Sequence, residues 1–267
     1  MKIGVVGYGT VGKAVAHGFR LKGHRVYVND VILRNREVSE KDFLMRECNL
    51  VFVCVQTPLK PSGIMDLSPL EQAVTELNDS VSDSGRNETL DSVVVIKSTV
   101  VPGTTLKFES QFPDLKFAVN PEFLRMKHAC RDFLRQERIV IGSSDKEITK
   151  KVSKAYKRWK CPIITTDPTT AETAKLLSNC FLTLKVAYAC EAAQICGVLG
   201  VNVKEVMDIV CMDPRIGTSH LDPTLGPVPR ESPCLPKDAI ALIQDLERRG
   251  CDPLLIKTAY AIGVEKG

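Results

Sequence analysis

Short apolar runs rich in valine and isoleucine recur along the first half of the chain, and helix-like or polar stretches separate them. Runs of this kind are typical of parallel strands that are buried between two layers of helices. The pattern therefore predicts a doubly wound α/β unit with a mostly parallel sheet. The predicted strands are Lys2–Val6, Arg25–Val28, Leu50–Val55, Ser92–Ile96, Lys116–Val119 and Arg138–Ile141, and the polar segment Asn78–Ser92 is predicted to be an exposed loop.

The pattern changes after residue 165. The stretch from Ala171 to Gly200 lacks proline and keeps an apolar stripe, and it follows Asp167–Thr170, which suits a helix cap. This stretch predicts one long helix, and shorter helices are predicted at Val203–Met212, Pro236–Arg249 and Pro253–Glu265. We expect two domains, an α/β domain over residues 1–165 and an all-helical domain over residues 166–267.

Composition narrows the class of protein. Of the 267 residues, 44% are apolar and 25% are charged, which is typical of a soluble globular chain. The net charge of +4 is mild and the basic residues are scattered, so we expect no nucleic-acid partner. No apolar stretch approaches the roughly 18 residues of a membrane span. The ten cysteines form no CxxC pair and follow no signal-like segment, so we expect a cytoplasmic protein without a metal site.

A glycine turn follows the first predicted strand. The sequence Gly7-x-Gly9-x-x-Gly12 opens a helical pattern, which is the context in which such glycines admit a pyrophosphate to a helix N-terminus. Asp30 ends the second strand, where a carboxylate accepts hydrogen bonds from ribose hydroxyls and repels a 2′-phosphate. The unit is therefore predicted to be a Rossmann domain that binds NAD. Arg34 and Arg36 leave NADP open, and a purely structural glycine turn is the alternative.

Three polar residues share one face of the predicted long helix. Glu172, Lys175 and Asn179 are spaced i, i+3 and i+7, so they are placed to present a cation and an amide to one small group. A solvated polar stripe has the same spacing. The residues alone leave both interpretations open.

A cysteine precedes a later predicted helix. Pro236 suits the first turn of that helix, which places Cys234 just before the N-terminus, where the helix dipole stabilises a thiolate. A buried, inert cysteine is equally consistent with the pattern. Asp238 either reaches the same site or serves as a first-turn acid.

Eight segments, in order along the chain, resemble motifs of the UDP-glucose/GDP-mannose dehydrogenase family. They are Gly7–Gly12, Val55–Pro58, Lys97–Val100, Asn120–Leu124, Arg138–Gly142, Ala171–Asn179, Asp213–Gly217 and Cys234–Asp238. The resemblance implies a Rossmann domain for NAD, followed by an all-helical domain that binds substrate and forms a homodimer through the long helix. It also implies oxidation of a primary alcohol to a carboxylate with two NAD in succession.

The same resemblance implies a role for each matching residue. Cys234 forms a thiohemiacetal with the aldehyde and then a thioester, while Lys175 and Asn179 hold the developing oxyanion. Glu122 is the general base, with a water positioned by Thr99 and Asp238. The implied cofactor-binding residues are Gly7, Tyr8, Gly9, Thr10, Val11, Gly12, Asp30, Val55, Thr57, Pro58, Ser98 and Thr99, and the implied substrate-binding residues are Glu122, Phe123, Leu124, Lys175, Asn179 and Arg215, the last in a neighbouring subunit.

The chain departs from the family where substrate is bound. Family members continue into a second nucleotide-binding domain, and we expect this domain to be absent here. The loop 227–233 has three prolines where the family has glycines, Met126 replaces a second glutamate, and Cys190 replaces an asparagine. A basic run near the site either attracts an anionic substrate or is a solvated helix face; it comprises Arg125, Lys127, Arg131, Arg135 and Arg138.

These departures leave the substrate open. One interpretation is a minimal enzyme for a smaller alcohol than a sugar nucleotide, and another is a sugar-nucleotide enzyme whose missing half comes from a separate chain. A relative that binds NAD or a sugar nucleotide without turnover and a two-electron alcohol or aldehyde dehydrogenase remain as alternative functions.

Overall fold

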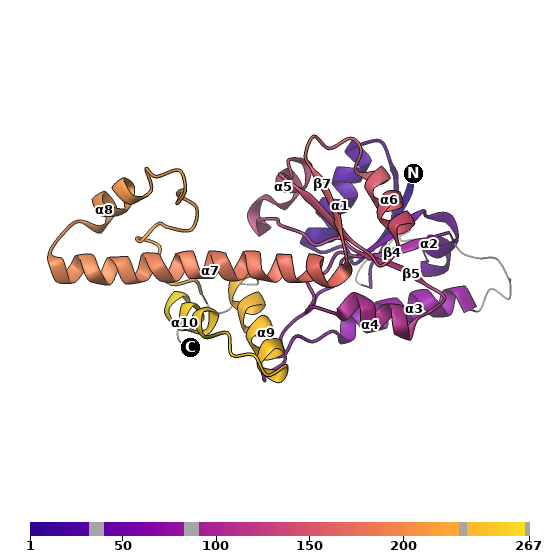
Figure 1. Ribbon diagram of the computed structural model, residues 1–267. Coiled ribbons are helices and arrows are strands. Elements are labelled where there is room, and N and C mark those ends of the chain that lie inside the picture. Colours follow the sequence, from indigo (N-terminus) through magenta and orange to yellow (C-terminus); the bar gives the residue numbers. More distant parts are fainter. Residues whose placement is uncertain (32–39, 83–90, 230–233, 265–267) are drawn as a thin grey trace. The chain divides into compact units, whose positions relative to one another are not determined.

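The computed structural model describes residues 1–31, 40–82, 91–229 and 234–264. Its strands are β1 (Lys2–Val6), β2 (Arg25–Asn29), β3 (Leu50–Val53), β4 (Val93–Ile96), β5 (Lys116–Val119), β6 (Ile139–Gly142) and β7 (Ile163–Thr166). Its helices are α1 (Thr10–Leu21), α2 (Lys41–Glu47), α3 (Ser68–Ser82), α4 (Thr104–Gln111), η1 (Met126–His128), α5 (Ala129–Leu134), α6 (Lys146–Ala155), α7 (Pro168–Leu199), α8 (Val203–Val210), α9 (Leu235–Arg248) and α10 (Leu254–Gly263), as labelled in Figure 1.

The strands form one sheet in the order β2-β1-β3-β4-β5-β6-β7. Every neighbouring pair is parallel except β5 and β6, which run antiparallel with Val119 opposite Gly142. The predicted mostly parallel, doubly wound sheet is therefore confirmed. Because β1, β3, β4 and β5 are mutually parallel, the segments that follow them emerge at the same edge of the sheet, where such folds bind nucleotides.

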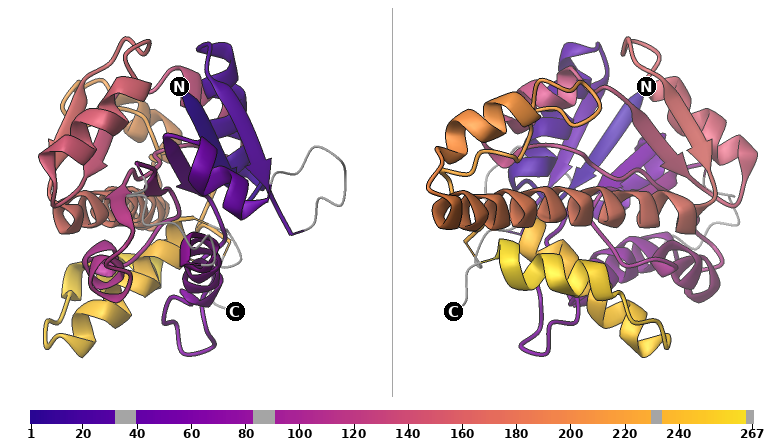
Figure 2. Two further views of the ribbon diagram at one scale, coloured as in Figure 1. Left: turned by 90° about the vertical axis from the view of Figure 1, so that its right-hand side faces the viewer. Right: turned by 60° about the vertical axis from the view of Figure 1, so that its left-hand side comes forward.

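Both faces of the sheet are covered, because alternate strand residues point to opposite sides. Leu50 and Phe52 of β3 pack in one hydrophobic core with α1, α5 and α6, whereas Val51 and Val53 pack in a second core with α2, α3 and α4. Figure 2 shows helices on both sides of these strands. The two cores fix the sheet from both sides and hold its edge in place.

The chain divides into two compact units. The first comprises Met1–Pro58 and Asp66–Lys175, and the second comprises Leu59–Met65 and Leu176–Gly267, so the division falls inside α7. In the second unit, Leu176 and Cys180 of α7 pack against Ala239 and Leu242 of α9. Gly263 of α10 lies so close to α7 that an added Cβ would stand 3.0 Å from the carbonyl oxygen of Thr183.

Three local predictions differ from the structure. The strand β7 was not predicted, and α3 runs to Ser82, so the polar segment 78–92 begins as helix rather than loop. Contrary to the membrane-span expectation, α7 is by length and composition alone able to cross a membrane, since an 18-residue window has a mean hydropathy of 1.3. Polar residues interrupt the apolar run of α7, but at most two charged residues fall within the window, so its mean hydropathy stays high.

Candidate functional site

The three glycines of the first turn play different parts. Gly7 has a φ of +87°, and an added Cβ would lie 2.9 Å from the backbone carbonyl of Cys54. At Gly12 an added Cβ would lie 1.9 Å from the carbonyl oxygen of Gly7. At Gly9 an added Cβ would meet nothing within 4 Å, so this position is open toward solvent. Gly7 and Gly12 are needed for packing, and Gly9 leaves room for a ligand.

The residues around this turn fit a dinucleotide. Helix α1 begins at Thr10 after Gly9, which caps it without a side-chain hydrogen bond, so its first N–H groups are available to an anion. The carboxylate of Asp30 lies beside the turn, where its Oδ2 accepts a hydrogen bond of 2.5 Å from the Tyr8 amide. Thr10 is exposed and Val11 is half-buried at the same helix end. Arg34 and Arg36 lie outside the described residues.

The loops after β3 and β4 are tied together by two hydroxyl groups. Thr57 donates a 2.7 Å hydrogen bond to the carbonyl oxygen of Thr99, and Ser98 donates one of 2.6 Å to that of Val55. Thr57 and Ser98 are buried, whereas Val55 and Thr99 are half-buried. Pro58 ends the first loop by accepting a hydrogen bond from the Asp66 amide. The predicted cofactor loops thus hold each other in place.

A buried ion pair lies in the first unit. The Lys175 ammonium stands 3.2 Å from Oε1 of Glu122, and the two side chains are only 5% and 12% exposed. The other carboxylate oxygen of Glu122 accepts a 2.6 Å hydrogen bond from the Leu124 amide. Two cations lie near the ring of Phe123, with Arg138 at 4.0 Å and Lys175 at 5.6 Å from the ring centre.

A second lysine, Lys97, was not among the predicted site residues. Its ammonium is fully buried and donates hydrogen bonds to Oδ1 of Asn120 at 2.9 Å and to the carbonyl oxygen of Pro121 at 3.3 Å. Burial lowers the pKa of Lys97 to about 8, although the negative charge of Glu122 opposes this shift. The sequence signal that could have pointed to Lys97 is a lysine directly after the fully apolar strand β4.

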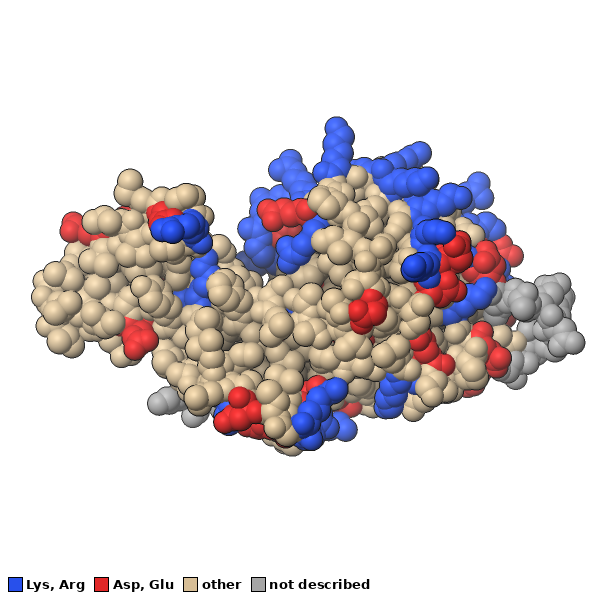
Figure 3. Space-filling model, in the orientation of Figure 1, with Lys and Arg blue, Asp and Glu red and all other residues tan. Residues whose placement is uncertain are grey.

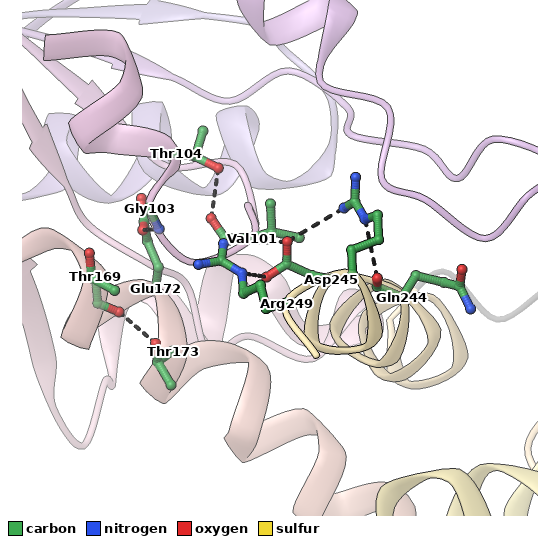
Figure 4. A network of polar contacts seen from close by, with 10 residues as sticks. Val101, Gly103, Thr104, Thr169, Glu172, Thr173, Gln244, Asp245 and Arg249 are labelled. Atoms are coloured by element: carbon green, nitrogen blue, oxygen red, sulfur yellow. Dashed lines mark hydrogen bonds and ion pairs between the residues drawn. The ribbon is translucent and has the colours of Figure 1, made fainter. Parts of the chain in front are cut away.

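Glu172 has a different partner from Lys175. Its buried carboxylate accepts a 2.6 Å hydrogen bond from the Gly103 amide (Figure 4). It also accepts hydrogen bonds from the Thr105 amide at 2.8 Å and from the Thr105 hydroxyl at 2.6 Å. These groups belong to the N-terminus of α4, whose cap, Gly103, supplies no side chain. Glu172 therefore acts as the missing helix cap rather than facing a ligand with Lys175.

In the second unit, Asn179 and Asp238 form a buried pair. The Asn179 amide donates a 2.6 Å hydrogen bond to Oδ2 of Asp238, whose other oxygen lies 2.8 Å from the Lys237 ammonium. Asp238 is 2% exposed. Burial, with a smaller contribution from the charge of Asp238, raises the pKa of the Cys180 thiol to about 12. Asp238 is thus held in place by α7 and by its own helix.

Cys234 occupies the predicted place before α9. It is the N-cap residue, it is half-exposed, and Pro236 follows it in the first turn. Its carbonyl oxygen accepts a 2.9 Å hydrogen bond from the Asp238 amide, which begins the helical ladder. The thiol is therefore at the positive end of the α9 dipole.

The remaining predicted residues lie on loops of the second unit. Arg215 has a side chain that is 87% exposed, and it forms a double hydrogen bond with Asp213. The part of the proline-containing loop that the structure describes pairs with the chain end, since the Val228 amide donates to the carbonyl oxygen of Gly263 at 2.8 Å. Residues 230–233 of that loop lie outside the described residues.

Basic side chains gather on the face of the first unit that carries α1, α5 and α6 (Figure 3). A shallow cavity of about 610 Å³ lies there. Its lining includes Lys146, Lys150 and Lys154 of α6 and Lys157, which follows that helix. In the predicted basic run, Arg125 is engaged by Asp132 at 2.8 Å. This cavity holds none of the predicted site residues, so the basic surface and the candidate site are separate features.

Two family models match the chain. Residues 33–160 match the NAD binding domain of the UDP-glucose/GDP-mannose dehydrogenase family, and residues 169–263 match its central domain. A UDP-glucose 6-dehydrogenase of Haloferax volcanii is 28% identical over an alignment that covers 98% of this chain and 69% of that protein. A UDP-glucose 6-dehydrogenase of Rickettsia bellii is 32% identical, with 83% of this chain and 50% of that protein covered.

A solved structure gives the same result for the fold. The UDP-glucose dehydrogenase of the archaeon Pyrobaculum islandicum matches with a TM-score of 0.85 and 30% identity, covering 98% of this chain and 67% of that one. This chain thus spans between about half and two thirds of the length of these proteins. The chain belongs to the UDP-glucose/GDP-mannose dehydrogenase family, and its cofactor is NAD.

Proposed function

We propose that this protein oxidises a primary alcohol of a sugar nucleotide to a carboxylate with NAD. The observation that carries the proposal is the buried pair of Lys175 and Glu122, 3.2 Å apart, in the same unit as the glycine turn. A buried cation beside a carboxylate supplies an oxyanion partner and a base. The relatives named above bear the name UDP-glucose 6-dehydrogenase, which supports a sugar nucleotide over a smaller alcohol.

The cofactor's part is limited to accepting hydride, and the chain supplies its binding site. The N-terminus of α1 and the open backbone at Gly9 suit the pyrophosphate, and Asp30 suits the adenosine ribose. The loops that Thr57 and Ser98 tie together complete the cofactor side. Tyr8, Thr10, Val11, Val55, Pro58 and Thr99 are assigned to the same site.

Lys175 and Asn179 are assigned to the substrate oxygen. They lie one turn apart on α7, so both side chains leave the same face of one helix. The Lys175 ammonium, already desolvated, donates more strongly to a developing oxyanion than a solvated ammonium would. Phe123, Leu124 and Arg215 are assigned to substrate binding around them.

Cys234 is the proposed nucleophile. Its thiolate adds to the carbonyl carbon of the aldehyde, and loss of hydride from that carbon leaves a thioester. Water then adds to the thioester carbon, Glu122 takes the water proton, and the C–S bond breaks to release the carboxylate and the thiolate. Thr99 and Asp238 are assigned to the attacking water. The alcohol gives up its hydroxyl proton and a first hydride when it becomes the aldehyde, and the thiohemiacetal gives up the second hydride. Each hydride reduces one NAD, so each substrate molecule yields two NADH.

A homodimer through α7 completes the proposal. The exposed apolar residues Leu177, Phe181, Tyr188, Ile195 and Leu199 recur at spacings of four and seven, which aligns them on one face of the helix. A stripe of this length suits a second copy of the same helix. We place the dimer in the cytoplasm, because the ten cysteines, all of which lie within the described residues, form no disulfide.

The test is a screen of sugar nucleotides, sugar phosphates and small alcohols, in which NADH and acid are measured together. Two NADH per acid with a sugar nucleotide is the expected result. Cys234→Ser should stop the reaction before acid forms, whereas Cys251→Ser, which changes an exposed cysteine, should leave it unchanged. Acid formation by Cys234→Ser at the wild-type rate would contradict the thioester. One NADH per turnover indicates a two-electron dehydrogenase, and none with any alcohol indicates a binding protein.

A further inference from the structure

The ammonium of Lys97 is the most unusual charge in the first unit. It is fully buried at the end of β4, and among the described residues no carboxylate lies within 4 Å of it. A buried charge is costly unless polar partners replace water. Its partners here are two neutral oxygens, of Asn120 and Pro121, which lie 23 and 24 residues away in the sequence.

Those two oxygens belong to the segment that leads directly into Glu122. The Asn120 side chain is fixed at three points, because its Oδ1 accepts from Lys97 and from the Tyr156 hydroxyl at 2.6 Å, and its amide donates to the carbonyl oxygen of Val140 at 2.6 Å. Lys97 also holds the Pro121 carbonyl, which is part of the peptide bond to Glu122. The direction in which the Glu122 side chain leaves the backbone is therefore set by these contacts.

The electrostatic surroundings of Lys97 have opposing signs. Glu122 stabilises its positive charge, and Lys175 opposes it. Cys54 of the loop after β3 also stabilises the charge of Lys97, and the ring of Phe133 in α5 lies 5.7 Å from the ammonium. The Tyr156 hydroxyl after α6 shares the Asn120 oxygen with Lys97. Burial has the largest effect on the pKa of Lys97, so Lys97 releases its proton more readily than an exposed lysine does.

We propose that Lys97 is a positioning residue for the general base, which it holds against Lys175 by fixing the Asn120–Pro121 segment. This inference rests on the proposed function, since it assigns Glu122 the role of base. Lys97 touches neither of the reacting groups, because its hydrogen bonds end at Asn120 and Pro121. A charged ammonium binds these two oxygens more tightly than a neutral amine does, so the hold weakens as Lys97 loses its proton.

The first test measures the proton on Lys97 without turnover. In the full chain, lysine side-chain NMR should show one signal that titrates near pH 8 and is missing in Lys97→Met. Glu122→Gln should lower that midpoint and Lys175→Met should raise it, while Lys204→Met, which changes an exposed lysine of α8, should leave it unchanged. A Lys97 signal near pH 10.5 that ignores Glu122→Gln would overturn the proposal.

The pH dependence of the stability of the chain tests the burial of the Lys97 charge without a measurement of activity. Lys97 has a lower pKa in the folded chain than in the unfolded chain, so the folded chain gives up this proton first. Burial of the cation destabilises the fold below about pH 8, and this penalty is relieved as the pH rises toward 10.5. The urea midpoint of the wild type relative to that of Lys97→Met should therefore rise over this interval. A constant difference would mean that the ammonium is not buried as described.

The kinetic test separates positioning from a general loss of structure. Lys97→Met should lower kcat about 10- to 100-fold while KM for NAD stays within about twofold. The kcat of the wild type should fall above about pH 8 as Lys97 loses its proton, and Lys97→Met should abolish this fall. Tyr156→Phe, which removes the second donor to Asn120 but keeps Lys97, should lower kcat less. Equal losses in kcat and NAD binding would assign Lys97 a structural role. If the wild type forms no NADH, the proposed function fails, and the NMR result still decides whether Lys97 responds to Glu122.

Discussion

At the scale of single residues, alanine should have different effects at two glycines of the same turn, Gly12 and Gly9. Gly12→Ala would place a methyl group 1.9 Å from the carbonyl oxygen of Gly7, so helix and turn must separate, at a cost of about 3 kcal/mol. Gly9→Ala meets no atom within 4 Å, and its φ of −70° suits alanine. It should keep wild-type stability but bind NAD about tenfold more weakly, since the methyl group points to where the pyrophosphate approaches.

Urea unfolding and calorimetric titration with NAD measure the two effects separately. Gly103→Ala provides a control for backbone strain. The φ of Gly103 is +94°, which is unfavourable for alanine, although an added methyl group would meet no atom within 4 Å. This variant should lose stability without a change in intrinsic NAD affinity. If Gly9→Ala binds NAD as the wild type does, the cofactor does not lie over this turn.

The candidate site was predicted from the sequence only as far as local patterns reach. The Gly7–Gly12 turn and the position of Cys234 before α9 follow from short-range rules, and both are present. The role of Lys97 depends on Asn120 and Tyr156, which only the folded sheet brings to it. No spacing rule connects residues so far apart in the chain, so the motif containing Lys97 was noticed and its buried charge was not.

At the scale of elements, Glu172 shows one helix completing another. Glu172→Ala removes three hydrogen bonds at the N-terminus of α4 and leaves the buried Thr105 amide and the half-buried Gly103 amide without this partner, which should cost about 3 kcal/mol. The expected result is a lower urea midpoint and faster amide exchange at Gly103 and Thr105. Glu137→Ala, which changes an exposed glutamate in the same unit, is the control and should leave both unchanged. Equal stability of the two variants would show that the cap is dispensable.

The elements predicted best were those with an unbroken apolar pattern. β1 and β5 were predicted to the residue, and α7 differs mainly by an earlier start at Pro168. β7 was missed because Ile163–Thr166 contains two threonines and is only partly buried, so it lacks the signal of an inner strand. α3 continues through polar residues to Ser82, because its Leu70, Val74 and Leu77 already anchor the helix in the core.

At the scale of the whole molecule, the apolar stripe of α7 is exposed over much of its length. Only 28% of its most apolar 18-residue window is buried, and Phe181 and Leu199 are 60% and 68% exposed. A soluble monomer seldom exposes a continuous apolar surface of this kind. Two occupants suit it, a second copy of the helix or a lipid bilayer. Lys185 and Glu191 flank the stripe, which favours the protein partner.

The assembly is tested by sedimentation equilibrium of the wild type and of Phe181→Glu combined with Ile195→Glu. The wild type should have the mass of two chains, and the double variant should dissociate at least about 100-fold more readily, because each carboxylate is buried without a partner at the helix contact. Leu254→Glu changes an equally exposed leucine on α10 and should remain dimeric. A monomeric wild type would contradict the proposal, and wild-type chains that float with phospholipid vesicles, when the double variant does not, would assign the stripe to a membrane.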